Sequence, residues 1–231
     1  MTEALTAMSV PFLWRIRMKT DGILFDLDGT LWDSCRVVAE SWGETLRRVC
    51  GTERGPGAAD VRGIMGMTGE QIARTLFSQY GERAGEISML CMEEETDYIA
   101  RHSGDVYPDV KEMLETLSQR FPLFLVSNCQ QGYIPCFLDC TGFAPFFKDS
   151  ACEGTTGLGK AENIALLCER YGLEHPTYVG DTVSDERSAR KAGCAFIHAA
   201  YGFGMAENPD AVINEPMELI ALMEREETAH V

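Results

Sequence analysis

The sequence predicts an α/β fold, a Rossmann-like parallel sheet core with an inserted all-helical cap domain, and three observations support it. First, short and almost continuously apolar runs occur at residues 22–26, 122–127, 177–181 and 194–199. Because these runs do not alternate, they indicate strands buried on both faces, as in a parallel sheet. Second, segments with helical spacing separate the later runs, which is typical of α/β proteins with right-handed crossovers. Third, an unusually long interval follows the first run.

The core helices are predicted from the spacing of apolar residues and from residues typical of helix ends. Apolar residues recur at helical spacing in residues 110–119, and Pro108 suits the first turn of that helix. Helical segments are also expected at residues 161–171, 185–192 and 216–224. A glycine directly follows the first two of these, which is a common signal for a helix C-terminus.

The long interval lies between Asp28 and Ser127 and holds 98 residues, whereas a crossover between parallel strands needs only about a dozen. We expect no good strand in it before the run at residues 122–127. Its helical segments are residues 34–50, 69–80 and 84–102. Thr68 and Gln71 have the spacing of a capping box at the start of the second segment. The interval therefore predicts a helical domain inserted after the first strand.

This interpretation divides the chain into a core and a cap. The α/β core takes residues 18–34 and 105–231, and the helical cap takes residues 35–104. An insertion beside the carboxyl end of a strand is placed to cover a ligand bound there. Residues 1–17 are expected to be a poorly ordered extension, with Met18 as an alternative start of the natural protein.

The overall composition excludes several classes of function. The 231 residues carry a formal net charge of −16, which repels nucleic acid and anionic lipid. No run approaches the ~18 apolar residues of a membrane span, and the N-terminus lacks the charge order of a signal peptide. The nine cysteines are scattered without a Cys-x-x-Cys pair, so reduced thiols fit better than disulfides or a zinc site. We expect a cytoplasmic monomer or weak dimer that acts on a small molecule.

Polar residues close three of the predicted strands, and ligands of open α/β sheets bind at such strand ends. These residues are Asp26, Ser127 with Asn128, and Asp181. Asp28 stands two residues after Asp26 on an extended chain, so both carboxylates project into one space. Because close carboxylates repel, one keeps a proton or a cation lies between them. Such a pair suits attack on phosphorus and protonation of the leaving oxygen. The alternative interpretation is a strand-end turn with solvated acids.

A second pair of acids, Asp181 and Asp185, begins the predicted helix that follows the third strand. Magnesium prefers one or two carboxylates together with waters and phosphate oxygens, and Asp26 and Asp181 can supply these from neighbouring strands. Asp185 could bind the metal ion through a water molecule, or it could orient a lysine. Alternatively, it is a first-turn acid favoured by the helix dipole. The expected cofactor is Mg²⁺.

Lys160, Ser127 and Asn128 are candidates for binding a phosphoryl group. Lys160 opens the helix at residues 161–171, where a positive charge is unfavourable unless an anion holds it. The hydroxyl, amide and backbone N–H groups of Ser127 and Asn128 can donate to phosphoryl oxygens. The alternatives are a solvated surface lysine and an ordinary turn.

Taken in order, these residues resemble the motifs of the haloacid dehalogenase-like superfamily, in the branch with a helical cap after the first motif. The motifs are DLDGTLWDS (26–34), Ser127-Asn128, Lys160 and GDTVSD (180–185). Further stretches resemble the phosphoglycolate phosphatase-like subgroup, namely VYPDV (106–110), SNCQQGYI (127–134), K-x-E-N-I (160–164) and YGFG (201–204). The resemblance covers about residues 20–205 and rests on several motifs in the correct order.

The resemblance implies a role for each matched residue. Asp26 would be the nucleophile that forms an aspartyl-phosphate and a ligand of Mg²⁺. Asp28 would act as general acid and then as base, and its backbone carbonyl would also bind Mg²⁺. Ser127 would hold the phosphoryl group, Lys160 would neutralise negative charge, and Asp181 would be a metal ligand. The implied function is a Mg²⁺-dependent phosphatase that hydrolyses a small phosphorylated metabolite.

Asp185 and Asn128 would have supporting roles in the site. Other positions bear on which substrate is used. The acid at position 28 argues against dehalogenation, because a leaving halide needs no proton. Trp32 replaces the small aliphatic residue common in phosphoglycolate phosphatases, and we expect its ring to narrow the pocket. The glycine-rich cap loop at residues 63–69 allows close approach to a ligand, so Gly66 and Met67 are candidate substrate contacts. The alternative is a flexible connection between helices.

Two competing functions remain open. A phosphomutase of the β-phosphoglucomutase type would use the same residues but protect the aspartyl-phosphate from water. It ranks lower because the cap loop has no obvious histidine or lysine for a sugar phosphate. A non-enzymatic protein that binds phosphorylated metabolites is disfavoured because every expected acid and the lysine are present.

Overall fold

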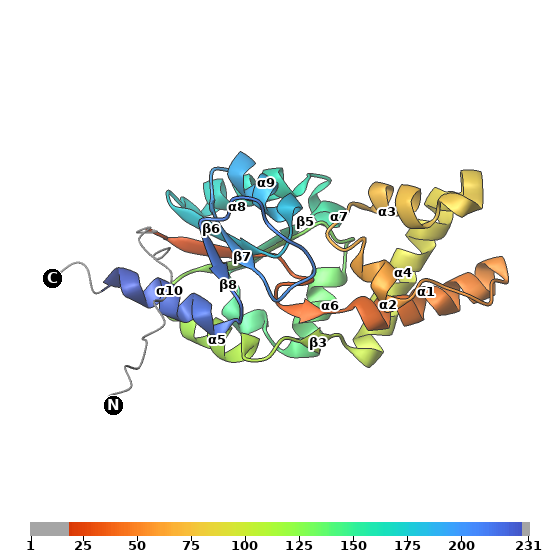
Figure 1. Cartoon of the computed structure of the whole chain (residues 1–231), viewed down its shortest axis with the longest axis horizontal. Coiled ribbons are helices and arrows are strands. Elements are labelled where there is room, and N and C mark those ends of the chain that lie inside the picture. Colours follow the sequence, from red (N-terminus) through yellow and green to blue (C-terminus); the bar gives the residue numbers. More distant parts are fainter. Residues whose placement is uncertain (1–18, 228–231) are drawn as a thin grey trace, which may run out of the picture.

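The computed structural model describes residues 19–227, so the expected extension at residues 1–17 lies outside the described residues. Figure 1 shows two lobes along the long axis of the molecule, one built around a sheet and the other made of helices. The helical lobe comes from the interval after the first strand, in the colours from orange to yellow. The α/β fold is as predicted.

The described residues form a six-stranded sheet in the order β5-β4-β1-β6-β7-β8, and every neighbouring pair is parallel. Its strands are β1 (Gly22–Phe25), β4 (Leu123–Ser127), β5 (Asp149–Cys152), β6 (Pro176–Gly180), β7 (Ala195–Ala199) and β8 (Ala211–Ile213). The three central strands β4, β1 and β6 are buried along their whole length, which explains their continuous apolar runs. The sequence did not predict the edge strands β5 and β8, because they are short and only partly buried.

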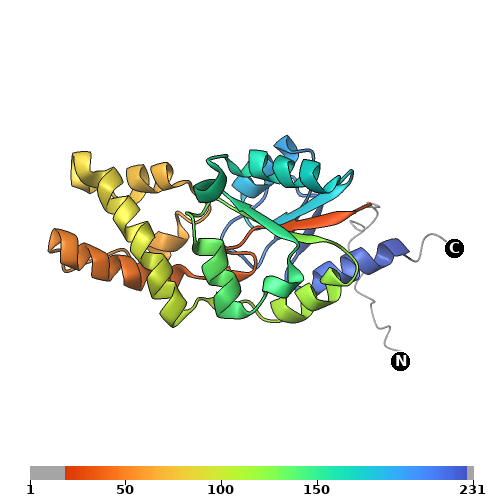
Figure 2. The same cartoon turned by 180° about the vertical axis from the view of Figure 1, so that it is seen from behind.

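Helices cover both faces of this sheet. Those described are α5 (Val110–Ser118), α6 (Tyr133–Thr141), α7 (Glu153–Thr156), α8 (Lys160–Tyr171), α9 (Val183–Lys191) and α10 (Met217–Glu227), with a 3₁₀ turn η2 (Ala144–Phe146). Figures 1 and 2 show α8 and α9 on one face, with α5 and α10 side by side on the other. The sequence predicted α5, α8, α9 and α10 within a few residues. It missed α6, whose apolar residues do not form a clear helical stripe.

The cap is connected to the core by a small two-stranded ribbon. Strand β2 (Trp32–Asp33) pairs antiparallel with β3 (Asp105–Val106), so the chain leaves and re-enters the core at one place. The sequence predicted no good strand in this interval and missed these two, because two-residue strands leave no periodic pattern to detect. The cap elements are α1 (Cys35–Cys50), α2 (Ala58–Arg62), α3 (Gly69–Leu76), the 3₁₀ helix η1 (Ser78–Arg83) and α4 (Ala84–His102). Thr68 and Gln71 form the predicted capping box.

Two further observations concern the cysteines and the helices. All nine cysteines lie within the described residues and are free thiols. Between residues 19 and 227, no helix is both long enough and apolar enough to cross a membrane.

Candidate active site

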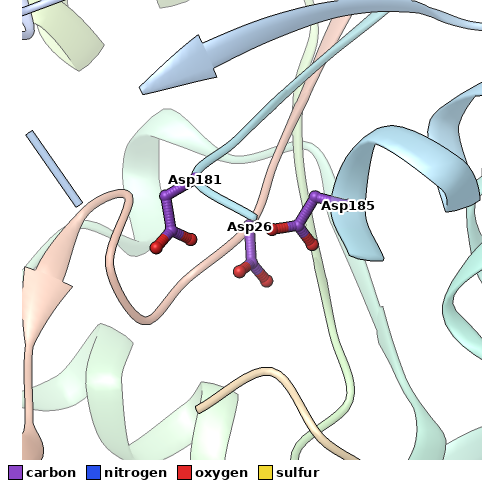
Figure 3. Close-up of side chains that lie close together, drawn as sticks. All are labelled: Asp26, Asp181 and Asp185. Atoms are coloured by element: carbon purple, nitrogen blue, oxygen red, sulfur yellow. The ribbon is translucent and has the colours of Figure 1, made fainter. Parts of the chain in front are cut away.

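Three carboxylates meet at the carboxyl edge of the sheet. Asp26 directly follows β1, Asp181 directly follows β6, and Asp185 lies in the first turn of α9. Because β1 and β6 are neighbouring parallel strands, their ends lie side by side, and the Asp26 N–H donates to the Val179 carbonyl at 2.8 Å. Oxygens of the three carboxylates lie within 4.8 Å of one another, and Figure 3 shows them gathered in one place. This acid cluster is buried.

Lys160 is the positive charge inside the acid cluster. Its Nζ donates to Asp26 Oδ1 at 2.8 Å and to Asp185 Oδ1 at 2.6 Å, and the side chain is almost fully buried. Burial alone would lower the pKa of Lys160, but the charges of Asp185 and Asp26 outweigh it and raise the pKa above the usual value. The lysine therefore stays charged. Two carboxylates thus balance the unfavourable position of a lysine at the start of α8.

One lysine does not balance three buried carboxylates. Burial and the charge of Asp185 raise the pKa of Asp26 well above its ordinary value, and the same two causes raise the pKa of Asp181 to about 7. Asp181 Oδ1 is buried and has no hydrogen-bond partner among the described residues. A buried carboxylate oxygen without a donor is unfavourable unless a cation binds it. The all-oxygen donor set fits the hard cation Mg²⁺.

The Gly-rich loop after β7 fixes the orientation of Asp181. The Phe203 N–H donates to Asp181 Oδ2 at 2.7 Å. A Cβ at Gly202 would collide with the Asp181 side chain and with the Gly29 carbonyl, so only glycine fits there. Asp185 is held by the Thr182 hydroxyl at 2.6 Å. Sequence reasoning gave Phe203 and Gly202 no role; the only signal was the YGFG stretch.

Asp28 lies outside the acid cluster, in a different hydrogen-bond network. Its Oδ1 accepts from Trp32 Nε1 at 3.0 Å, from Ser34 Oγ at 2.6 Å and from the Tyr133 hydroxyl at 2.9 Å. Burial raises the pKa of Asp28 although these three donors oppose the shift. A carboxyl that keeps its proton more readily than usual is suited to donating it. Ser34 and Tyr133 were not predicted as site residues, although both lie in quoted motifs.

The structure corrects the expected role of Trp32. Its side chain is fully buried and packs edge-on against Tyr133 and Phe137, and it does not line the cavity described next. The indole therefore does not narrow the pocket as expected. Instead it positions Asp28 through the indole N–H.

A cavity of about 50 Å³ lies between the core and the cap. Asp28, Ser127 and Asn128 line it from the core, and Gly66 and Met67 line it from the cap loop. The Asn128 amide donates to the Gly66 carbonyl at 2.8 Å, so the loop is held directly over the ends of the strands. The structure thus brings the predicted loop residues to the predicted site. Their contact with a substrate stays a prediction.

The family follows from comparison with known proteins. Over residues 23–199 the sequence matches the family model described as haloacid dehalogenase-like hydrolase. The chain belongs to this family. It is 31% identical over 218 residues to a phosphoglycolate phosphatase of Vibrio vulnificus, covering 86% of this chain and 93% of that protein. It is 32% identical over 202 residues to a phosphoglycolate phosphatase of Vibrio cholerae, covering 80% and 86%.

Solved structures of the family share this fold. A haloacid dehalogenase-like hydrolase of Streptococcus pneumoniae superposes with a TM-score of 0.77 at 24% identity, covering 88% of this chain and 98% of that chain. A predicted phosphoglycolate phosphatase of Haemophilus somnus gives 0.75 at 23% identity, covering 88% and 97%. The comparisons confirm the predicted family, its phosphoglycolate phosphatase-like character and the enzyme class, a hydrolase of phosphoric monoesters.

Proposed function

We propose that this haloacid dehalogenase-like hydrolase is a Mg²⁺-dependent phosphatase that hydrolyses a small phosphorylated metabolite through an aspartyl-phosphate on Asp26. One observation carries the proposal. Two carboxyl groups at one strand end, Asp26 and Asp28, are held in different environments: one in a charged cluster with Lys160, the other in a neutral network of donors. Such a difference separates a nucleophile from a general acid.

Each residue of the candidate site would have its own role in the reaction. An Asp26 carboxylate oxygen attacks phosphorus, and the phosphoryl group transfers to it as the bond to the leaving oxygen breaks. Asp28 gives its proton to that oxygen, then takes a proton from the water that hydrolyses the aspartyl-phosphate. Lys160 and the Ser127 hydroxyl stabilise charge on the transferring oxygens.

Mg²⁺ would be held by Asp26, Asp181 and the backbone carbonyl of Asp28, with Asp185 in support. When bound, it neutralises charge on the phosphoryl oxygens and on the acid cluster. Support comes from the buried, unpartnered Oδ1 of Asp181 and from the excess of carboxylates over lysine in the cluster.

The composition of the cavity disfavours the phosphomutase alternative. A mutase must hold a second phosphate far from the nucleophile, and cationic side chains normally do this. The described residues that line the cavity include no lysine, arginine or histidine. The names of the relatives make 2-phosphoglycolate the reference substrate for any assay.

The test is phosphate release from p-nitrophenyl phosphate with and without Mg²⁺, for the wild type and for Asp26→Asn. We expect activity that requires the metal and that falls by about 10³-fold or more in Asp26→Asn. The matched control Asp97→Asn removes a carboxylate from an exposed position and should keep full activity. Activity that survives Asp26→Asn would exclude Asp26 as the nucleophile.

A further inference from the structure

The cap contributes a buried carboxyl group that the proposed reaction does not use. Glu95 of α4 is only 4% exposed and lines the cavity opposite Asp28 and Ser127. Its Oε2 accepts from Trp42 Nε1, and its Oε1 accepts from Gln130 Nε2 at 2.6 Å. Burial raises the pKa of Glu95 to about 8, even though these two donors act against the shift. The fold thus holds a carboxyl group in an unfavourable place and in a fixed orientation.

The remaining cavity wall determines what can lie next to Glu95. On the cap side it is apolar and rich in sulfur, formed by Trp42, Ile64, Met65, Met67, Ile72 and Met92. None of the described lining residues is a lysine, arginine or histidine. Lys160 and Arg62 are both paired elsewhere, Lys160 with two aspartates and Arg62 with Asp33 at 2.6 Å.

This wall discriminates between the end groups that a leaving alcohol can carry. A carboxylate would be buried without a cation and next to another carboxyl group, with which it would have to share a proton. A hydroxyl or ammonium group would donate instead. Each Glu95 oxygen accepts one hydrogen bond within the protein, and once the carboxyl group has released its proton each oxygen keeps a further lone pair for such a donor. The apolar side chains around it accommodate methylene groups.

We propose that this cavity is the subsite for the leaving group, and that Glu95 selects phosphate esters of small alcohols whose far end donates a hydrogen bond, as a hydroxyl or ammonium group does. A carboxylate in the same position is discriminated against. The proposal rests on the proposed phosphatase function and adds its substrate class. It separates this chain from its named relatives, since the alcohol released from phosphoglycolate carries a carboxylate.

Four esters of two-carbon alcohols test the subsite: 2-hydroxyethyl phosphate, 2-aminoethyl phosphate, ethyl phosphate and 2-phosphoglycolate. For the wild type with Mg²⁺, we expect kcat/KM for the hydroxyl and ammonium esters to exceed that for 2-phosphoglycolate by about tenfold or more. Ethyl phosphate, which lacks the donor, should lie between them. Wild-type protein suffices for this comparison, so it does not depend on the folding of a variant.

The role of Glu95 is tested with Glu95→Gln and with the control Asp97→Asn, which removes an exposed carboxylate from the same helix. In Glu95→Gln, the preference for the ammonium ester over ethyl phosphate should fall by about tenfold, mainly through KM, because binding rather than chemistry is altered. Asp97→Asn should keep all ratios. A Glu95→Gln variant with unchanged ratios would show that Glu95 is only structural and would overturn the proposal.

Calorimetric binding of the four esters to the Asp26→Asn variant, with Mg²⁺ present, gives a second readout that needs no turnover. The hydroxyl and ammonium esters should bind more tightly than 2-phosphoglycolate. If the wild type hydrolyses 2-phosphoglycolate as well as the other esters, the subsite proposal fails and the phosphatase function stands. If neither these esters nor p-nitrophenyl phosphate is hydrolysed but the expected order of binding is found, the phosphatase function fails, whereas the selectivity of the cavity for a donor end group stands.

Discussion

The two sides of the candidate active site differ in their electrostatics, since the core side is highly charged and the cap side is mainly apolar. On the core side, two strand ends and the first turn of α9 gather three carboxylates around one lysine, so charge is concentrated where a doubly charged phosphoryl group and a cation would bind. On the cap side, a single buried carboxyl group is surrounded by thioethers and branched aliphatic side chains. Under the proposed function, the core would determine which reaction is catalysed, whereas the cap would determine which alcohol fits. Changes on the core side should therefore alter kcat, and changes on the cap side should alter KM.

The largest effect that would sharpen this contrast is expected for Asp28→Asn. Without the proton donor, kcat/KM for an alkyl phosphate, which reports formation of the aspartyl-phosphate and not its hydrolysis, should fall by about 10² to 10⁴-fold. The loss should be much smaller for p-nitrophenyl phosphate, because its phenolate leaves without a proton. Steady-state rates with the two esters measure the ratio. Equal losses with both would exclude Asp28 as the general acid.

The acid cluster predicts a stabilising effect of the metal. Saturating Mg²⁺ should raise Tm by roughly 5 to 10 °C, because ligand at about 100 times its Kd adds about 2.7 kcal/mol to the free energy of unfolding. Asp181→Asn removes the carboxylate with the unpartnered oxygen and should abolish this shift. Thermal melts of both proteins, with Asp97→Asn as the control, measure it. A full shift in Asp181→Asn would place the metal elsewhere.

The raised pKa of Glu95, on the cap side, predicts that the free energy of unfolding depends on pH. Its pKa in the folded protein is about 8, above the ordinary 4.5, so the folded state keeps a proton that the unfolded chain has released. The free energy of unfolding should therefore fall as the pH rises from about 5 to about 8 and then level off. Urea denaturation of the wild type and Glu95→Gln at about pH 5 and about pH 9 isolates this contribution. A stability difference between them that does not change with pH would contradict it.

The smallest effect is expected where the two sides touch. Asn128→Ala removes the hydrogen bond from the core to the Gly66 carbonyl of the cap loop. A single neutral hydrogen bond contributes about 1 kcal/mol, so KM should rise by roughly fivefold with little change in kcat. Steady-state kinetics with the preferred ester measure this split. A loss confined to kcat would instead give Asn128 a direct role with the phosphoryl group.

The sequence allowed more residues of the site to be predicted on the core side than on the cap side, and the reason is physical. A buried central strand has a continuous apolar signature, and the residue that ends it is easily located, which is how Asp26, Ser127 and Asp181 were found. Lys160 was identifiable because a lysine is unfavourable at a helix start. The cap side has no such signature, since Glu95 looks like one of several acids on a helix until the packing of α4 buries it.

The errors have physical explanations too. Trp32 was placed in the pocket because its position relative to the motif was known, whereas the direction of its side chain was not. Only the packing of α6 shows that the indole is enclosed by Phe137 and Tyr133. Edge strands β5 and β8 were missed because they pair on one side only and need few apolar residues. Local pattern thus predicted which residues gather at the strand ends more reliably than where their side chains point.

The ribbon formed by β2 and β3 limits how caps can be exchanged between members of this family. Trp32 lies in β2, pairs with Val106 of β3 and donates to Asp28, so one residue belongs to both the connection and the proposed acid network. A Cβ at Gly104 would come within 2.7 Å of the indole, so the returning strand must carry a glycine there. A chimera that takes β2 from one parent and Gly104 with β3 from the other would mismatch this contact and disturb Asp28. Junctions at the start of α1 and the end of α4 keep Trp32 and Gly104 together in the core, so the unit that can be transplanted is the helices without the ribbon.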